Sequence, residues 1–199
     1  TGTAANVFAR STEGLDRPDL QMMALPLSGD ARIWVRQPVS RLSVRTGYLA
    51  QKSRGWVKLR SADPRDPPRI FLNLFAEPGD LGGMVAALRL SRRIYAQSPL
   101  RERSARENRP GADVRSDDDL AEYIRRHANH RAHPAGSCRM GTGHDAVVDA
   151  ELRLHGIDAL RVVDASVMPT LPRGNPNLAC MMIGEKAADL ILGRTKPFA

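Results

Sequence analysis

The chain has 199 residues, of which 42% are hydrophobic and 26% are charged, a balance typical of a globular protein of one or two domains. Its formal net charge of +8 comes mainly from arginines interspersed with acids, and only 5% of its residues are aromatic, so we expect no nucleic-acid partner. No apolar run reaches the roughly 20 residues of a membrane span, and residues 1–13 lack the features of a secretory signal peptide. The first residue is Thr, not Met, as expected of a fragment or a processed product.

The region from residue 19 to residue 60 predicts antiparallel strands. Residues 20–25 and 31–35 are apolar runs, and a Ser-Gly-Asp turn signal at 28–30 separates them. We therefore expect two neighbouring strands joined by this turn.

Residues 56–60 predict a further strand. Val57 and Leu59 alternate with cationic residues, a pattern typical of a half-buried strand with one wet face. The three prolines within 63–68 indicate a turn, and residues 69–73 predict a short strand after it.

Two helices are predicted in the middle of the chain. Apolar residues recur at helical spacing over 79–97, with cationic residues near the C-terminal end. Ser116 is a favourable N-cap for the second helix, because three aspartates follow in its first turn.

The last quarter of the chain predicts two strands and a helix. Residues 152–154 and 160–163 read as strands around a turn at Gly156. The helix is expected to begin at Asn175, with Pro176 in the favoured first helical position. Because this helix is apolar almost all round, we expect it to be buried, either within the chain or against a partner.

His127, His130 and His133 recur at a spacing of three and precede Cys138, which permits a reading as metal ligands. Pro134 disfavours helix at His133, and no carboxylate or second cysteine completes a tetrahedral set, so we assign no metal ligand and keep a metal site as the lesser alternative. His133 differs from the other two, because the proline and the small residues after it would hold its ring rigidly against a cavity. His133 is therefore a candidate catalytic residue.

Polar residues also stand at two turns near the C-terminus. Asp164 and Ala165 follow a predicted buried strand, where an acid is either a simple cap or part of a ligand-binding turn. Asn175, at the start of a helix, is either a cap or a polar group at a site that favours negative charge. The run 141–146 matches the G-x-G-x-x-A dinucleotide pattern, but it lacks the preceding strand and following helix that the motif needs.

Cys138 and Cys180 are the two cysteines of the chain and lie far apart in sequence. This usage fits a reduced protein better than a disulfide scaffold. Two unpaired cysteines also predict a cytoplasmic location. Both residues lie in apolar runs, so we expect two buried free thiols.

Several runs carry a recognisable combined pattern. They are His-Pro-Ala-Gly-Ser-Cys-Arg-Met-Gly at 133–141, Leu-Arg-Val-Val-Asp-Ala-Ser at 160–166 and Gly-Glu-Lys-Ala-Ala-Asp at 184–189. Together they resemble the C-terminal signature of the glucose–methanol–choline (GMC) family of flavoprotein oxidoreductases. Residues 53–64 are similar to the family's Ser-Arg-Gly segment, although Gln51 stands where Pro is usual. The choline dehydrogenase-like branch is the most similar.

The resemblance implies the C-terminal portion of an FAD-dependent alcohol oxidoreductase. It implies oxidation of a primary alcohol, choline-like or aliphatic, to the aldehyde by hydride transfer to flavin N5. His133 stands at the position of the family's active-site histidine, and Asn175 at that of its second active-site residue, which is His in some members and Asn in others. The positions that match the family's FAD-contacting segments are Asp164, Ala165, Asn175, Pro176, Asn177 and Leu178.

The resemblance also implies the architecture. We expect an α+β fold, with one antiparallel sheet of about five or six strands covered by helices on one face. Residues 1–142 would form the substrate-binding domain with the active-site histidine loop, and residues 143–199 the segment that returns to complete the flavin domain. The glycine-rich N-terminal FAD-binding portion is missing from this chain, so alone it should bind FAD weakly or not at all.

A non-catalytic or degenerate substrate-binding fragment is the alternative to an enzyme. The sequence leaves open which alcohol is oxidised, whether oxygen or another acceptor reoxidises the flavin, and the oligomeric state.

Overall fold

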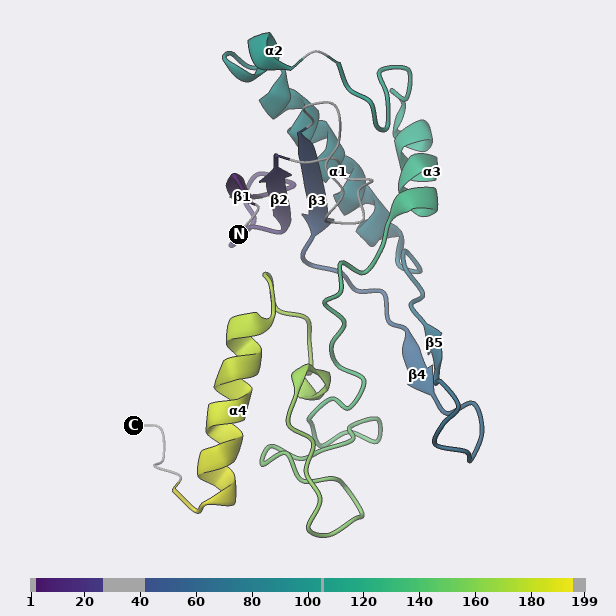
Figure 1. Ribbon diagram of the computed structural model, residues 1–199, viewed down its shortest axis with the longest axis vertical. Helices are drawn as coiled ribbons and strands as arrows, with labels where there is room; N and C mark the ends of the chain where they lie inside the picture. The colour runs from purple at the N-terminus through teal and green to yellow at the C-terminus, as the bar shows by residue number, and fades with distance from the viewer. Residues whose placement is uncertain (1–2, 27–41, 105, 195–199) are drawn as a thin grey trace. The chain divides into compact units, whose positions relative to one another are not determined.

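The computed structural model describes residues 3–26, 42–104 and 106–194, which are coloured in Figure 1. Its contacts divide the chain into two compact units. Unit 1 consists of Thr1–Arg54 and Asn73–Asn129, and unit 2 of Gly55–Leu72 and His130–Ala199. None of the helices in the described ranges has the length and apolar content needed to span a bilayer.

Unit 1 holds a three-stranded antiparallel sheet in the order β1-β2-β3, together with three helices. Its elements are β1 (Ala5–Ala9), β2 (Leu20–Leu25), β3 (Ser43–Tyr48), α1 (Pro78–Tyr95), α2 (Leu100–Arg103) and α3 (Asp117–His127). The prediction for 20–25 is confirmed to the residue. The strand predicted at 31–35 and its turn at 28–30 lie outside the described residues.

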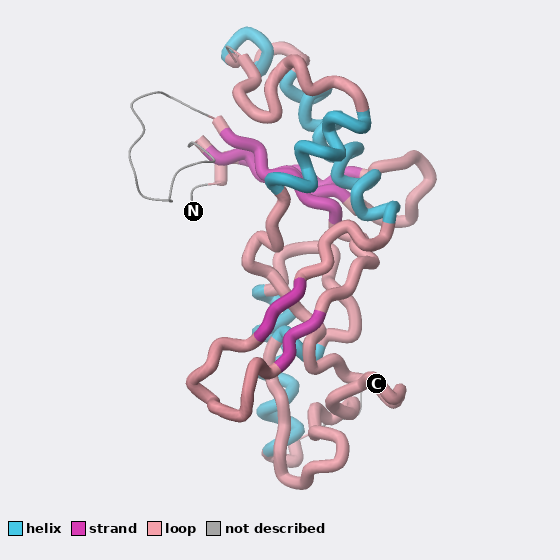
Figure 2. The backbone as a smooth tube through the Cα atoms, turned by 90° about the vertical axis from the view of Figure 1, so that its right-hand side faces the viewer, coloured by secondary structure: helices cyan, strands magenta, loops and turns pink. Residues whose placement is uncertain are grey.

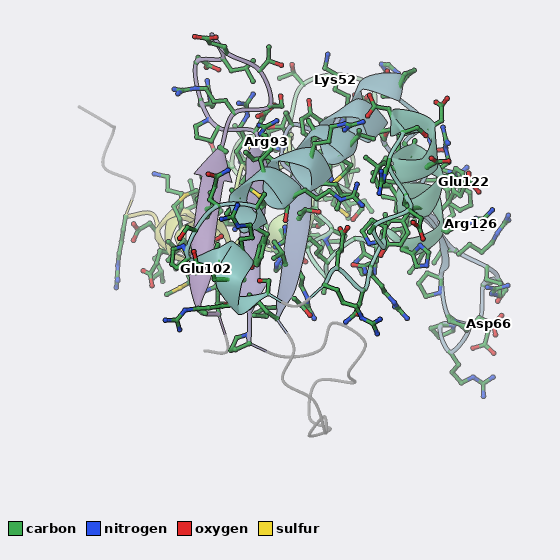
Figure 3. The ribbon with its side chains drawn as sticks, turned by 90° about the horizontal axis from the view of Figure 1, so that it is seen from above. Lys52, Asp66, Arg93, Glu102, Glu122 and Arg126 are labelled. Carbon is green, nitrogen blue, oxygen red and sulfur yellow. The ribbon has the colours of Figure 1, made fainter. Side chains whose placement is uncertain are left out.

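The central strand β2 anchors the sheet. Leu20 pairs with Ala9 on one side and with Tyr48 on the other. Leu20 and Met22 are 1% and 3% exposed, because α1 packs across β2 and β3 (Figures 2 and 3). The apolar side chains of the strand are thereby removed from water, which is the main source of stability in such a layer.

Helix α1 approaches β3 closely because of a glycine. A Cβ on Gly83 would lie 2.4 Å from the ring of Tyr48, so any other residue would push the helix away. The buried Asp80 carboxylate accepts hydrogen bonds from the backbone N–H groups of Lys52 and Ser53, at 2.9 and 2.8 Å. These bonds fix the chain that leaves β3, and the helix predicted over 79–97 is confirmed as Pro78–Tyr95.

Helix α3 begins with the predicted Ser116 cap, which is confirmed as a full capping box. The Ser116 hydroxyl accepts from the Asp119 N–H at 3.0 Å, and the Asp119 carboxylate accepts from the Ser116 N–H. These bonds lower the pKa of Asp119. Leu120 and Ile124 bury one face of α3 against Val85 of α1.

Unit 2 contains less regular structure. Its elements are β4 (Trp56–Lys58), β5 (Arg69–Phe71), the short 3₁₀-helix η1 (Ala165–Val167) and α4 (Asn177–Ile191). Its core is a single apolar cluster that joins loop residues to η1 and α4. The buried members are Val148, Leu152, Val167, Met168, Ile183 and Ala187.

The β4–β5 hairpin corrects one prediction. Its two strands pair antiparallel, with Trp56 opposite Phe71, so the predicted strands exist. The predicted burial of alternate residues is wrong, because Val57 and Leu59 are 52% and 84% exposed. Among the described residues of unit 2, no segment covers this apolar face.

The strands predicted at 152–154 and 160–163 are also wrong as regular strands. Their only ladder contacts in the described structure are isolated bridges, such as Arg153 with Arg161. The predicted single sheet is replaced by a three-stranded and a two-stranded sheet in the described residues. The α+β class is confirmed, and the functional division after residue 142 stays a prediction.

Candidate functional site

The predicted histidine loop and the predicted flavin turn lie side by side in unit 2. Three backbone hydrogen bonds join them, from the N–H groups of Gly136, Cys138 and Met140 to the carbonyls of Ala165, Ser166 and Val167, at 3.3, 2.9 and 2.8 Å. The donors are alternate residues of an extended loop, and the acceptors are the three consecutive carbonyls of η1. Two motifs separated by about 30 residues in sequence are thus held in a fixed register.

Glycine is required at one position where these two segments are hydrogen-bonded. Gly136 has φ +86°, and a Cβ there would lie 3.1 Å from the carbonyl oxygen of Met168. Only glycine adopts this conformation without strain. The adjacent side chains of Val167 and Met168 are buried in the unit 2 core, so the loop is seated on a packed surface.

His133 enters this loop directly after a tight turn. Its backbone N–H donates to the carbonyl of His130 at 3.1 Å. The His133 imidazole is exposed, and within the described ranges it has no hydrogen-bond partner. Its ring nitrogens are therefore available to an external group.

Asp164 caps η1. Its Oδ1 accepts a hydrogen bond from the Ser166 N–H at 2.7 Å, so the cap interpretation is confirmed for the side chain. Ala165 contributes its carbonyl to the join with Gly136 and packs against the core. The backbone contact with FAD that the resemblance implies at this turn stays a prediction.

Helix α4 begins two residues later than predicted, at Asn177. Pro176 is the N-cap, because its carbonyl accepts the first helical bond, from the Cys180 N–H at 2.8 Å. Asn175 lies just before the cap and is exposed, and no hydrogen bond of the described structure joins it to His133. No side chain caps the first turn of α4, so its leading N–H groups remain available as donors.

The burial of α4 is one-sided in this chain. Ile183 and Ala187 are 7% and 1% exposed and pack in the core of unit 2. Leu178, Met181 and Met182 are 76%, 61% and 60% exposed. Of the two predicted possibilities, burial within the chain therefore accounts for one face of α4 only.

The metal-site reading finds no support. The described residues contain no group of three or more His, Cys, Asp or Glu side chains that could hold a metal ion. His127 uses Nδ1 to bond the Tyr123 carbonyl at 2.8 Å, and His130 uses Nδ1 to accept from the Ala132 N–H at 3.1 Å. Cys138 and Cys180 are free thiols, as predicted, but they are half-buried and not buried.

A groove of about 560 Å³ lies between α1 and α3 in unit 1. Its lining contains none of the predicted site residues and includes Leu81, Val85, Asp117, Ala121 and Glu122. Its acids are partly neutralised, since Asp117 pairs with Arg89 and Glu122 with Arg126 (Figure 3). The groove therefore carries no functional assignment.

Comparisons with known proteins show which family the chain is similar to. A family model described as GMC oxidoreductase matches residues 51–184. The oxygen-dependent choline dehydrogenases of Chromohalobacter salexigens and Brucella anthropi are each 40% identical to the chain, over 187 and 190 residues. Each alignment covers 94% of this chain, but only 34% and 35% of the relative. The chain thus spans about a third of the length of the curated relatives it matches.

Solved structures are also similar. Pyridoxine 4-oxidase from Mesorbium loti aligns with a TM-score of 0.85 at 28% identity, covering 98% of this chain and 39% of the oxidase. A formate oxidase from Aspergillus oryzae, studied for its FAD modification, aligns with a TM-score of 0.82 at 30% identity, covering 90% and 32%. The family read from the sequence is confirmed: the chain belongs to the GMC oxidoreductases.

Proposed function

We propose that this chain is the C-terminal portion of an FAD-dependent alcohol oxidoreductase that converts a primary alcohol, choline-like or aliphatic, to its aldehyde. The choline dehydrogenases that share 40% identity with the chain support the substrate class. The FAD named for the similar formate oxidase supports the cofactor.

The observation that carries the proposal is the backbone join between the two motifs. It places the loop after His133 against the turn at Asp164 and Ala165. A hydride can pass from an alcohol to a flavin only when both are held close together and correctly oriented. The backbone bonds between the two segments would hold a proton-handling loop close to a cofactor-facing turn.

The residues present fit a flavin. The first turn of α4 offers backbone N–H groups that no side chain caps, and a helix N-terminus stabilises negative charge on a bound anion. We infer that Asn177 and Leu178 would face the pyrimidine side of the ring system, with Asn175 and Pro176 beside it. FAD, when bound, would supply the hydride acceptor N5.

His133 would handle the proton of the reaction. Oxidation of R–CH₂–OH to R–CHO removes the hydroxyl proton as well as a hydride. A neutral imidazole can accept that proton and can hydrogen-bond the developing alkoxide, and the His133 ring is exposed with no protein partner among the described residues. The Asn175 carboxamide would orient the same oxygen.

The rest of the active enzyme would come from an upstream portion. The chain covers about a third of its relatives, and the exposed side chains of Leu178, Met181 and Met182 offer an apolar surface for it. We propose that this portion carries most of the FAD contacts. A cytoplasmic location stays a prediction from cysteine usage.

Replacing His133 tests the catalytic assignment. In the complete enzyme, we expect His133→Ala to lower the rate constant for flavin reduction by alcohol by about 10²–10⁴-fold, measured by rapid mixing under anaerobic conditions, with little change in FAD content. His144→Ala is the matched control, since His144 is another exposed histidine of unit 2. Equal reduction rates for the wild type and His133→Ala would refute the assignment.

Replacing Asn175 tests the second role. We expect Asn175→Ala to slow flavin reduction and Asn175→His to retain most of the rate, because histidine also offers a polar group at that position.

A flavin titration of the purified chain, followed by gel filtration, tests whether the upstream portion is needed to bind FAD. FAD retained by the chain alone with micromolar affinity would contradict that part of the proposal.

The alternative is a non-catalytic substrate-binding fragment. It predicts that the chain combined with an FAD-loaded upstream portion supports no flavin reduction with choline or with aliphatic alcohols, even when the two portions associate.

A further inference from the structure

We propose that His130 is a positioning residue for His133: its imidazole stabilises a left-handed turn that sets the direction in which His133 enters the active-site loop. This inference rests on the proposed role of His133 in alcohol oxidation. It concerns a residue that the family signature at 133–141 does not include.

The turn over residues 130–133 has an uncommon conformation. Arg131 and Ala132 have φ +53° and +59°, and the His133 N–H donates to the His130 carbonyl at 3.1 Å. Two consecutive left-handed residues closed by such a bond form the type I′ pattern. Glycine and asparagine dominate these positions, because other L-residues are strained there.

Neither central residue is of a type that favours this conformation. Arginine and alanine both carry a Cβ, which disfavours the left-handed region. A contact from the side chain of a neighbouring residue would therefore favour the turn.

His130 supplies this contact. Its Nδ1 accepts a hydrogen bond from the Ala132 N–H at 3.1 Å. The side chain of the first turn residue thus bonds the N–H two positions on, as aspartate and asparagine do in an Asx-turn. The bond requires a neutral ring with its proton on Nε2, because a protonated Nδ1 cannot accept.

The turn matters for His133 because it is one of two anchors on a short segment. On one side the His133 N–H is bonded to His130, and on the other the Gly136 N–H is bonded to Ala165. Only Pro134 and Ala135 lie between these two anchored residues, and Pro134 has a fixed φ. If the first anchor loosens, the Cα–Cβ direction of His133 changes while the second anchor keeps the loop on the core.

The test uses paired substitutions in the complete enzyme. We expect His130→Ala to lower the flavin-reduction rate constant at saturating alcohol by about tenfold, the effect of one net hydrogen bond. His130→Asn should restore it to within about threefold, since an asparagine oxygen reaches the same N–H. FAD content should be unchanged in both, and His144→Ala serves as the control for loss of an exposed histidine.

A second pair separates positioning from general loss of structure. Arg131→Gly in the His130→Ala background should recover part of the lost rate, because glycine adopts positive φ without strain. Ala132→Val should lower the rate, because a β-branched residue is poorly tolerated at positive φ.

The contact can also be observed without turnover. In the ¹⁵N-labelled chain we expect a scalar coupling across the hydrogen bond between the Ala132 amide nitrogen and His130 Nδ1, with ring nitrogen shifts of the Nε2–H tautomer. Absence of the coupling in folded protein would overturn the inference.

The two proposals fail in different ways. If His133→Ala reduces flavin normally, the proposed function fails, whatever His130 does. If His133→Ala is severely impaired but His130→Ala matches the wild type, only the positioning role fails. A His130→Asn variant as slow as His130→Ala would also overturn it, because the acceptor atom would then not be the cause.

Discussion

The two units of the chain are held together in different ways. Unit 1 is organised by regular elements, with α1 packed on a three-stranded sheet and α3 fixed by its capping box. Unit 2 has one helix longer than a single turn, and loops contribute much of its core in the described residues. Its long-range order depends on individual backbone bonds, such as the one from Met140 to Val167.

Exposed apolar side chains are also distributed unequally. In unit 2 they include the hairpin residues Val57 and Ile70 and the α4 residues Leu178 and Met181. Exposed large apolar side chains mark a surface that another body covers where they form a contiguous patch. Among the described residues, unit 1 therefore covers more of its large apolar side chains than unit 2 does, although Val7, Phe8 and Leu42 of unit 1 are exposed too.

The largest expected effect comes from the core of unit 1. Leu120 is 0% exposed, so Leu120→Ala leaves a cavity and should lower the free energy of unfolding by about 3 kcal/mol. The same substitution at Leu178, which is 76% exposed, should cost less than about 0.5 kcal/mol. Urea unfolding would measure the loss of stability in both variants, and amide hydrogen exchange would locate it in the chain.

The part of the chain that loses stability in Leu120→Ala tests whether the two units unfold separately. If the two units are distinct in stability, faster exchange in Leu120→Ala should be confined to amides of unit 1. Equal acceleration across residues 130–194 would show that the whole chain unfolds as one cooperative body.

A smaller effect is expected at the join in unit 2. Gly136→Ala places a Cβ 3.1 Å from the Met168 carbonyl at φ +86°, which should cost about 2 kcal/mol. Gly184→Ala is the matched control, because nothing lies within 4 Å of its Cβ position and alanine favours helix. We expect hydrogen exchange at Cys138 and Met140 to accelerate only in Gly136→Ala. Unchanged protection of these amides would contradict the proposed need for glycine.

Sequence signals were most informative where structure is local. The α3 start could be predicted from Ser116 and the following aspartates, because capping involves residues three positions apart. Strand β2 could be predicted from its apolar run. Strand β1 (Ala5–Ala9) escaped prediction, because it is short and its side chains are mostly exposed.

Sequence signals failed where a residue's environment depends on distant chain. The alternation at 56–60 is that of a half-buried strand, yet Val57 faces water here, since periodicity identifies an apolar face but not its cover. Residues 152–154 read as a strand, but in the described residues they form only two isolated bridges, Leu154 with Val148 and Arg153 with Arg161.

The candidate site shows the same limit. The family resemblance identified His133 and Asp164, but the register that joins their segments is visible only in three dimensions. The turn at 130–133 had no usable signal, because Arg-Ala is not a pair that predicts two left-handed residues.

The smallest expected effect is an acid-sensitive contact in unit 2. The Asp149 carboxylate accepts from the Arg153 N–H at 2.9 Å, from the Glu151 N–H at 2.8 Å and from Arg153 Nε at 3.0 Å. The backbone bond from Arg153 is the main reason that the pKa of Asp149 lies below its model-peptide value of 3.8. The bonds close a tight loop that buries Leu152, which has φ +64° and is 4% exposed.

The sign of the pH dependence follows from the lowered pKa. The folded state prefers the ionised carboxylate, so its stabilising contribution is fully present above the unfolded pKa and is lost as pH falls through the lower folded pKa. The urea midpoint of residues 147–155, followed by their amide NMR signals, should therefore fall less steeply in Asp149→Asn than in the wild type as the pH drops below about 4. Asp158→Asn, at an exposed aspartate of the same unit, should leave the fall as it is in the wild type. If the urea midpoint falls equally with pH in Asp149→Asn and in the wild type, other carboxylates cause the loss of stability of unit 2 in acid. Individual hydrogen bonds would then contribute less to the stability of this unit than its apolar core does.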